Sequence, residues 1–259
     1  MAEMAGYDKR LFWDRAYSRP DPEGPILGPG PEERAIVAAL RELAGDGPVL
    51  ELAVGNGRIA IPLAATGVEV DGIDIAPNAI EQIRAHPQGG AVNASVADIS
   101  DFALDRKYSL IYCVANSLFN VLTQDGQIRC FELVAAHLAP GGVFLVHSSY
   151  TPQWFETLRN GQYVEARHFE LGFAFLQALR VDPAEQLVYQ QNISLTKDGT
   201  TFSPSIHRYA SLGELDLMAR IAGLKRLDQW GSWTREPFRA STTWGGMPSP
   251  ILLATYGAA

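Results

Sequence analysis

Three acidic residues occupy positions where a protein of alternating strands and helices binds ligands. Glu51, Asp74 and Asp98 each lie in or just after an apolar segment with the composition of a strand. Gly55 and Gly57 follow the first segment, and glycine lets a ligand approach the backbone closely. Carboxylates at strand ends hold hydroxyl and amino groups, and the N–H groups that begin the next helix favour an electron-rich ligand. The spacing predicts a nucleotide-binding site.

Glu51 distinguishes between two kinds of nucleotide. A dinucleotide site places a pyrophosphate at the glycine turn, where Glu51 would repel it, whereas a cationic amino group or a sulfonium would be attracted. The third glycine of the dinucleotide pattern is Ala60 here, a replacement that such sites tolerate. Asp74 would hold ribose hydroxyls in either case. The acid inside the first strand therefore favours a sulfonium ligand.

Strands and helices alternate in the part of the chain that must position these groups. Strand composition occurs at 49–53, 68–75, 91–96, 108–114 and 143–147, and helical periodicity at 31–45, 59–65, 77–84 and 124–138. Two later strands are expected at 224–230 and 251–256, after a helix that begins with a capping box at Ser211 and Glu214. The pattern predicts an α/β fold: a doubly wound, Rossmann-like, mostly parallel sheet of seven strands with helices on both faces.

After the fifth expected strand, the alternation of strand and helix patterns stops. Segments 163–175, 186–195 and 201–209 have strand composition with no helix between them, and Lys197-Asp198-Gly199 is typical of a hairpin turn. We expect an antiparallel, strand-rich lid inserted after the fifth strand. The lid and the segments after it are rich in aromatic residues: Tyr163, Phe169, Phe173, Phe175, Tyr189, Phe202, Tyr209, Trp230, Trp233 and Trp244.

The charge and composition of the chain exclude several kinds of binding partner. The chain has 21 basic and 29 acidic residues, a net charge of -8, which repels phosphate backbones, so a nucleic-acid partner is not expected. Cys113 and Cys130 lie in apolar segments without metal-ligand spacing, as expected of reduced core residues. No apolar run reaches the roughly 18 residues of a membrane span, and no targeting segment precedes the first helix. We expect a cytoplasmic protein with no membrane partner.

Four motifs in order carry a family resemblance. VLELAVGNGR, GIDIAP with Asp74, VADIS with Asp98, and LAPGGVFLV span residues 47–147. The series resembles that of class I S-adenosylmethionine-dependent methyltransferases of the small-molecule type, with Ala53 where the family has its first glycine. The resemblance implies S-adenosylmethionine as the cofactor and methyl donor.

The resemblance also implies a place for each residue around the donor. Gly55 and Gly57 would face its methionyl part with Glu51 nearby, Asp74 would take the ribose hydroxyls, and Asp98 would accept the adenine amino group. Tyr17 belongs to an aromatic arm that either folds over the donor or simply docks on the core. The residues expected to bind the donor are Tyr17, Glu51, Ala53, Gly55, Asn56, Gly57, Asp74, Ile75, Asp98, Ile99, Val114, Asn116 and Phe119.

The acceptor is expected outside the strand ends, near the loop 114–119 and the segment 147–150. His147 is the first candidate for a general base, because it ends a strand and histidine titrates near neutrality. His207 and Tyr209 on the lid are the second candidates, and a purely structural role remains open for all three. No metal is expected, because the loops lack the acidic pattern of catechol O-methyltransferases and the histidines show no ligand spacing.

The expected reaction is in-line transfer of a methyl group from S-adenosylmethionine to a nitrogen or oxygen of a small apolar or aromatic molecule. The alternatives are a protein that binds the donor without methylating, and a nicotinamide oxidoreductase of the same fold. Four parts are expected: an aromatic arm (1–30), the donor-binding core (31–150), the acceptor lid (151–210), and a segment that completes the core sheet (211–259). The acceptor, the atom methylated, the need for a base, and the choice between monomer and homodimer stay open.

Overall fold

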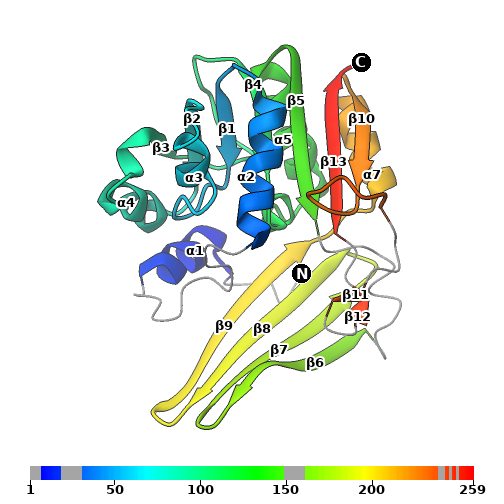
Figure 1. Cartoon of the computed structure of the whole chain (residues 1–259). Coiled ribbons are helices and arrows are strands. Elements are labelled where there is room, and N and C mark those ends of the chain that lie inside the picture. The colour runs from blue at the N-terminus through cyan, green and yellow to red at the C-terminus, as the bar shows by residue number, and fades with distance from the viewer. Residues whose placement is uncertain (1–6, 19–30, 149–160, 239–242, 245–246, 249–250) are drawn as a thin grey trace.

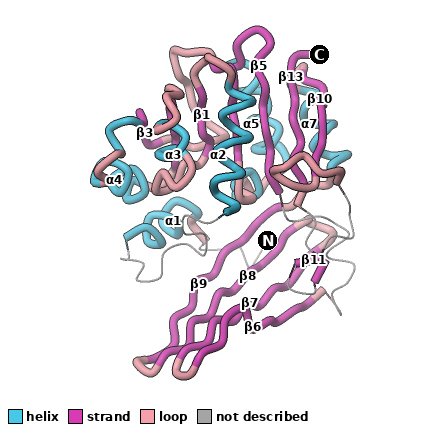
Figure 2. Tube along the Cα trace, in the orientation of Figure 1, coloured by secondary structure: helices cyan, strands magenta, loops and turns pink. Residues whose placement is uncertain are grey.

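The protein is described by a computed structural model for residues 7–18, 31–148, 161–238, 243–244, 247–248 and 251–259. Figure 1 shows a helix-flanked sheet with a second sheet extending away from one end of it. Figure 2 shows the same division by secondary structure, because the described part of the second sheet consists of strands and turns alone. The predicted residues Ser149 and Tyr150, and the arm residues 1–6 and 19–30, lie outside the described residues.

The main sheet has seven strands, and the predicted fold class is confirmed. Five neighbouring strands run parallel. On one side of these five lie two more strands, and the inner one of the two is antiparallel to both of its neighbours. In spatial order the strands are β10 (Leu224–Trp230), β13 (Leu252–Ala258), β5 (Leu138–Ser148), β4 (Tyr108–Cys113), β1 (Val49–Leu52), β2 (Val70–Asp74) and β3 (Val92–Val96). The carboxyl ends of β1, β2, β4 and β5 meet at one edge, which faces the second sheet (Figure 1).

Helices cover both faces of this sheet because each has one apolar side. The hydrophobic cluster on one face takes Phe131 from α5 and Met218 from α7. The cluster on the other face takes Leu40 from α2, Leu63 from α3 and Ile80 from α4. The helices are α2 (Pro31–Ala44), α3 (Ala60–Ala64), α4 (Pro77–Ala85), α5 (Gln124–His137) and α7 (Leu212–Ile221), with short 3-10 turns η2 (Gly89–Ala91) and η3 (Ser117–Asn120).

Side-chain caps fix where two of the helices begin. Thr123 accepts a hydrogen bond from Gly126 N at the start of α5. Ser211 accepts one from Glu214 N at the start of α7, which is one half of the predicted capping box, whereas the Glu214 carboxylate accepts from Arg208 and Gln186 instead. None of the described helices has the length and apolar composition that a membrane span requires.

The lid is confirmed as a four-stranded antiparallel sheet inserted after β5. The segment 163–175 is not one strand, because Gly172 adopts φ +90° and turns the chain between two strands. Residues of the lid base, among them Leu179 and Val188, join the hydrophobic cluster of the main sheet. The lid strands are β6 (Gln162–Glu170), β7 (Phe173–Asp182), β8 (Leu187–Thr196) and β9 (Gly199–Arg208). The short strands β11 (Thr243–Trp244) and β12 (Met247–Pro248) pair with each other in a sheet of their own.

The N-terminal helix α1 (Lys9–Ser18) packs against α4 beneath the carboxyl edge of the main sheet (Figure 1). Asn78 N donates to Asp14 Oδ1 over 2.8 Å, and the Asn78 side chain donates to the Asp14 carbonyl. The Gln82 side chain donates to the carbonyl of Tyr17. These bonds place α1 across the region where the sequence predicts a nucleotide.

Candidate functional site

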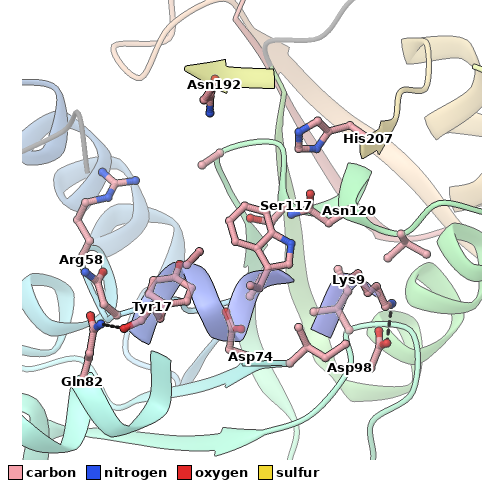
Figure 3. A pocket seen from close by; sticks show the side chains of 18 residues that line it. Lys9, Tyr17, Arg58, Asp74, Gln82, Asp98, Ser117, Asn120, Asn192 and His207 are labelled. Atoms are coloured by element: carbon pink, nitrogen blue, oxygen red, sulfur yellow. Dashed lines mark hydrogen bonds and ion pairs between the residues drawn. The ribbon is translucent and has the colours of Figure 1, made fainter. Parts of the chain in front are cut away.

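A cavity of about 740 Å³ lies between α1, the carboxyl ends of the core strands and the lid. This volume falls within the range of small-molecule sites, roughly 300–1,000 Å³. Figure 3 shows its labelled side chains converging from these three parts of the chain. The lining residues are Lys9, Trp13, Ala16, Tyr17, Ala53, Asn56, Arg58, Asp74, Ile75, Gln82, Asp98, Ile99, Ala115, Ser117, Asn120, Val121, Asn192 and His207.

Asp74 links the end of β2 to the glycine turn. Its Oδ2 accepts a hydrogen bond from Gly55 N at 2.8 Å, and its Oδ1 accepts one from Ala76 N at 2.9 Å. Burial raises the pKa of Asp74, and these backbone hydrogen bonds oppose the rise. The carboxyl group is therefore held in one orientation at the wall of the cavity.

The turn after β1 is a backbone cradle that leaves no room for a side chain at Gly55 or Gly57. Gly55 has φ +55°, and a Cβ added to it would lie 2.5 Å from the Tyr17 hydroxyl. Gly57 has φ +82°, and a Cβ there would meet Ile61 at 2.8 Å. Ala53, at the position where the resemblance expects a glycine, also adopts a left-handed conformation with φ +59°. An alanine there carries a strain of about 1–2 kcal/mol, which explains why glycine suits this position.

Asp98 is paired with the N-terminal helix. Lys9 Nζ lies 2.6 Å from Asp98 Oδ2, and Oδ1 accepts hydrogen bonds from the Ser100 backbone and hydroxyl at 2.9 and 2.8 Å. Burial alone raises the pKa of Asp98, but the bonds from Lys9 and Ser100 outweigh it and hold the pKa below its usual range. Asp98 is therefore a carboxylate at the cavity wall, already in contact with a cation.

Glu51 does not line the cavity. Its side chain is 2% exposed behind the glycine turn, and Tyr112 Oη donates to its Oε2 at 2.8 Å. Burial raises the pKa of Glu51 to about 8, against the opposing effects of the Tyr112 hydroxyl and the Arg58 charge. Glu51 is therefore largely protonated at pH 7 and acts on the cavity through the turn that it supports.

The lid side of the cavity is polar and carries no acid among the described residues. Asn192 on β8 and His207 on β9 line this side, and Figure 3 shows His207 next to Asn120 of η3. His207 Nε2 lies 3.1 Å from Ser205 Oγ, and burial lowers the pKa of His207 to about 4. The imidazole of His207 is therefore neutral at pH 7.

His147 and Tyr209 are not among the lining residues, contrary to the expectation that they would meet the acceptor. His147 Nδ1 accepts a hydrogen bond from Ala115 N at 3.0 Å, and Trp233 packs against the ring with centroids 5.3 Å apart. Burial lowers the pKa of His147 to about 4, with a smaller effect from Arg58. The imidazole therefore holds the loop after β4, in which Ala115 has φ +55°.

The structure brings together only part of the predicted set. Those that line the cavity are Tyr17, Ala53, Asn56, Asp74, Ile75, Asp98, Ile99 and His207. Those that do not are Glu51, Gly55, Gly57, Val114, Asn116, Phe119, His147 and Tyr209. Val114 and Phe119 are buried in the core clusters, and Asn116 has φ +63° in the turn that begins η3. None of the described lid aromatics lines the cavity, whose aromatic side chains are Trp13 and Tyr17 of α1.

Sequence reasoning missed several lining residues. Arg58 follows the glycine turn directly, and this position was the one sign in the sequence that it could reach a ligand. An arginine in a first helical turn usually faces solvent, so the predicted set does not contain it. Lys9 and Asn192 carried no signal, because nothing local to their segments points to a ligand. The described residues contain no cluster of His, Cys, Asp and Glu that could hold a metal ion.

Comparisons with known proteins agree with this geometry. A family model described as a methyltransferase domain matches residues 49–142. A cypemycin N-terminal methyltransferase of a Streptomyces species is 27% identical over 237 residues, which cover 90% of this chain and 94% of that protein. The structure of an S-adenosylmethionine-dependent methyltransferase from Clostridium acetobutylicum has the same fold, with a TM-score of 0.72 and 16% identity over 88% of this chain and 90% of that one.

The CcbJ methyltransferase from Streptomyces caelestis is similar along the whole chain. Its structure matches with a TM-score of 0.87 and 32% identity, covering 98% of this chain and 100% of that one. A match of this extent spans the lid as well as the core. The chain therefore belongs to the S-adenosylmethionine-dependent methyltransferases.

Proposed function

We propose that this methyltransferase methylates the nitrogen of an amine on a small molecule, held between the donor and the polar wall of the lid. The observation that carries the proposal is the division of one cavity into two unlike walls. The core wall has the acids Asp74 and Asp98, whereas the lid wall has Asn192 and His207, which are uncharged at pH 7. The first wall suits a nucleoside, and the second suits an acceptor whose amine must keep its lone pair.

The donor would lie along the core wall. Asp74 takes the ribose hydroxyls, and Asp98 accepts the adenine amino group, with Ile75 and Ile99 against the adenine ring. The glycine turn would face the methionyl part, and the Tyr17 hydroxyl, which a Cβ at Gly55 would meet at 2.5 Å, lies beside it. Glu51 lies behind the turn, is largely protonated at pH 7 and therefore presents little charge to the donor.

The acceptor would meet the amide of Asn192. Asn192 Oδ1 accepts hydrogen bonds from Gln177 Nε2 at 3.2 Å and Gln190 Nε2 at 3.0 Å. The carbonyl end of the amide is therefore occupied by β7 and β8, and the NH₂ end is left to donate into the cavity. This arrangement suits a hydroxyl or carbonyl group on the acceptor, while Trp13 offers a flat apolar surface.

The chemistry needs alignment more than acid or base catalysis. S-adenosylmethionine supplies a methyl group on a sulfonium, and the nitrogen–carbon bond forms as the carbon–sulfur bond breaks, its electron pair staying on sulfur. His207, neutral at pH 7, accepts a hydrogen bond from the amine N–H and so aims the lone pair at the methyl carbon. The product ammonium then loses its extra proton to water. The lid and α1 exclude bulk water from the reacting atoms.

Relatives support nitrogen as the acceptor atom. Two of them have names that describe transfer to nitrogen. They are the cypemycin N-terminal methyltransferase and a dTDP-3-amino-3,6-dideoxy-alpha-D-glucopyranose N,N-dimethyltransferase of Streptomyces fradiae. The second is 28% identical over 54% of this chain. Ubiquinone biosynthesis O-methyltransferases also match, so oxygen is the alternative that the experiment must separate.

The test is methyl transfer from radiolabelled donor to paired acceptors that differ only in carrying an amine or a hydroxyl. We expect label in the amine members, and label confined to the hydroxyl members would contradict the proposal. Asp74→Asn should weaken S-adenosylhomocysteine binding at least about tenfold, since hydrogen bonds to a charged partner contribute about 1.5–3 kcal/mol. Asp105→Asn, at an exposed position, is the matched control.

The cellular setting proposed is the cytoplasm, without a nucleic-acid partner. Cys113 and Cys130 are free thiols buried in the core, a state typical of a reducing compartment. The net charge of -8 disfavours binding to phosphate backbones.

A further inference from the structure

Arg58 brings an unmatched positive charge to the cavity. Its side chain lines the space, and its Nη1 is buried without a hydrogen-bond partner among the described residues. A buried guanidinium N–H group without an acceptor is costly, so it indicates an anion that binds beside it.

The nearby acids do not supply that anion. Both oxygens of Asp74 accept backbone N–H groups, from Gly55 and Ala76. Glu51 accepts the Tyr112 hydroxyl from behind the turn, and the raised pKa of Glu51, caused mainly by burial, leaves it largely protonated at pH 7. Neither carboxyl group forms an ion pair with Arg58 in the described structure. The partner of the guanidinium must therefore come with a ligand.

The place of Arg58 indicates which part of a ligand this is. It follows Gly57, and Figure 3 shows its guanidinium beyond Tyr17, on the side of the cavity away from Asp98. Burial dominates the pKa of Tyr17 and of Glu51, and the Arg58 charge lowers both. The guanidinium therefore belongs to the glycine-turn end of the cavity.

The donor has one anionic group, and it lies at the end opposite the adenine. With the adenine at Asp98 and the ribose at Asp74, the methionyl amino-acid group extends toward the glycine turn and Arg58. We propose that Arg58 binds the α-carboxylate of the donor's methionyl group, where its planar fork matches the two carboxylate oxygens. The inference rests on the proposed placement of the donor along the core wall.

Arg58 complements the negative charge of a donor that carries charges of both signs. Glu51 is largely protonated at pH 7 and contributes little charge at this end of the cavity, so the guanidinium of Arg58 is the charge that the donor's carboxylate meets. By holding the carboxylate, Arg58 fixes the rotation of the methionyl chain. The methyl group is thereby aimed at the acceptor wall.

The test combines a ligand change with a protein change. Calorimetry measures the dissociation constants of S-adenosylhomocysteine and of its decarboxylated analogue, 5′-deoxy-5′-(3-aminopropylthio)adenosine, for the wild type and for Arg58→Met. The wild type should prefer S-adenosylhomocysteine at least about tenfold, as expected of a charge-assisted bond. Arg58→Met should bind the two ligands with affinities within about threefold of each other, and Arg58→Lys should keep part of the preference.

The control is Arg84→Met, which removes an exposed arginine from α4 and should leave the preference unchanged. The proposal is overturned if Arg58→Met keeps the tenfold preference, or if the wild type shows none. It is also overturned if Arg58→Met changes only the KM of the acceptor, which would assign the guanidinium to an acceptor anion. Failure of the wild type to bind either ligand would instead overturn the proposed donor site. Arg58→Lys and thermal unfolding of each variant separate a local effect from loss of the fold.

Discussion

Lys9 of the N-terminal helix contacts Asp98 with its Nζ 2.6 Å from Oδ2. The same carboxylate is the group that we propose for the adenine amino group, and its other oxygen is already bonded to Ser100. Helix α1 therefore places its own cation where the donor would bring a hydrogen-bond donor. The ion pair must be shared or broken when the adenine binds.

Lys9→Met should consequently tighten donor binding. The pair is about one-quarter exposed on each side, and such pairs contribute about 0.2–1 kcal/mol, so the gain in affinity for S-adenosylhomocysteine is at most about fivefold. Calorimetry measures it. Arg10→Met removes the same charge from an exposed position of the same helix and should change nothing. A weaker affinity in Lys9→Met would mean that Lys9 supports the ligand and does not compete with it.

Gly55→Ala should abolish donor binding for a reason of space. The new Cβ would lie 2.5 Å from the Tyr17 hydroxyl and project into the cradle. Affinity for S-adenosylhomocysteine should fall more than about tenfold, since one unfavourable contact of about 1.4 kcal/mol already costs that factor. Adding Tyr17→Phe removes the clashing oxygen and leaves the ring carbon 3.4 Å away, so part of the lost thermal stability should return.

Gly45→Ala is the matched control for backbone strain. Gly45 has φ +57°, nearly the same as Gly55, but a Cβ there would meet nothing within 4 Å. Both variants should lose about 1–2 kcal/mol of stability from the left-handed conformation. Only Gly55→Ala should lose donor binding, and an equal loss in both would refute the argument from space.

The order of the elements was predictable because it depends on local periodicity. Apolar runs alternated with helical patterns, and the Ser211 capping box marked the start of α7 as the structure has it. The split of 163–175 into β6 and β7 was missed because the only local signal was Gly172, a single residue in an aromatic run. A strand pattern does not reveal a turn that one glycine makes with φ +90°.

The site was predictable only where its residues belong to contiguous motifs. Asp74 and Asp98 follow strands of the main sheet, so topology alone brings them to one edge. Asn192 reaches the cavity because β8 pairs with β7 and β9 in a sheet whose docking angle the sequence does not contain. Topology alone does not decide where a side chain of such a strand points. The strand of His147 does end at this edge, but the imidazole accepts a hydrogen bond from Ala115 N and is not among the residues that line the cavity.

The stability of the protein should depend on pH through Glu51. Burial raises its pKa from an ordinary value of 4.5 to about 8, so the folded chain holds a proton that the unfolded chain has lost between these pH values. Stability must therefore fall as the pH rises through this window, by up to about 1.4 kcal/mol per pH unit, and level off above it. Urea unfolding at about pH 5 and about pH 8 measures the fall. Glu51→Gln, which keeps an acceptor for Tyr112, should show a flatter dependence, and equal slopes would contradict the assignment.

Arg208 ties the lid to the core through buried polar contacts. It donates to Gln127 Oε1 of α5 at 2.6 Å and to Gln186 Oε1 at 2.8 Å, and it pairs with Glu214 Oε1 of α7 at 2.6 Å. Burial alone raises the pKa of Glu214, but the bonds from Arg208 and Gln186 outweigh it and lower the pKa. The ionised pair therefore contributes stability above the ordinary pKa of a glutamate, and this contribution is lost as the pH falls through the lowered value.

Arg208→Met should therefore destabilise the protein by about 3–5 kcal/mol at pH 7, because the Glu214 charge loses its partner in a site where the arginine is only 6% exposed. Urea unfolding followed by circular dichroism measures the change. Arg220→Met removes an exposed arginine from the same helix as Glu214 and should cost less than about 0.5 kcal/mol. The double variant Arg208→Met with Glu214→Gln should recover part of the loss, because no unpaired charge remains. If Arg208→Met cost no more than the control, the pair would not be what anchors the lid.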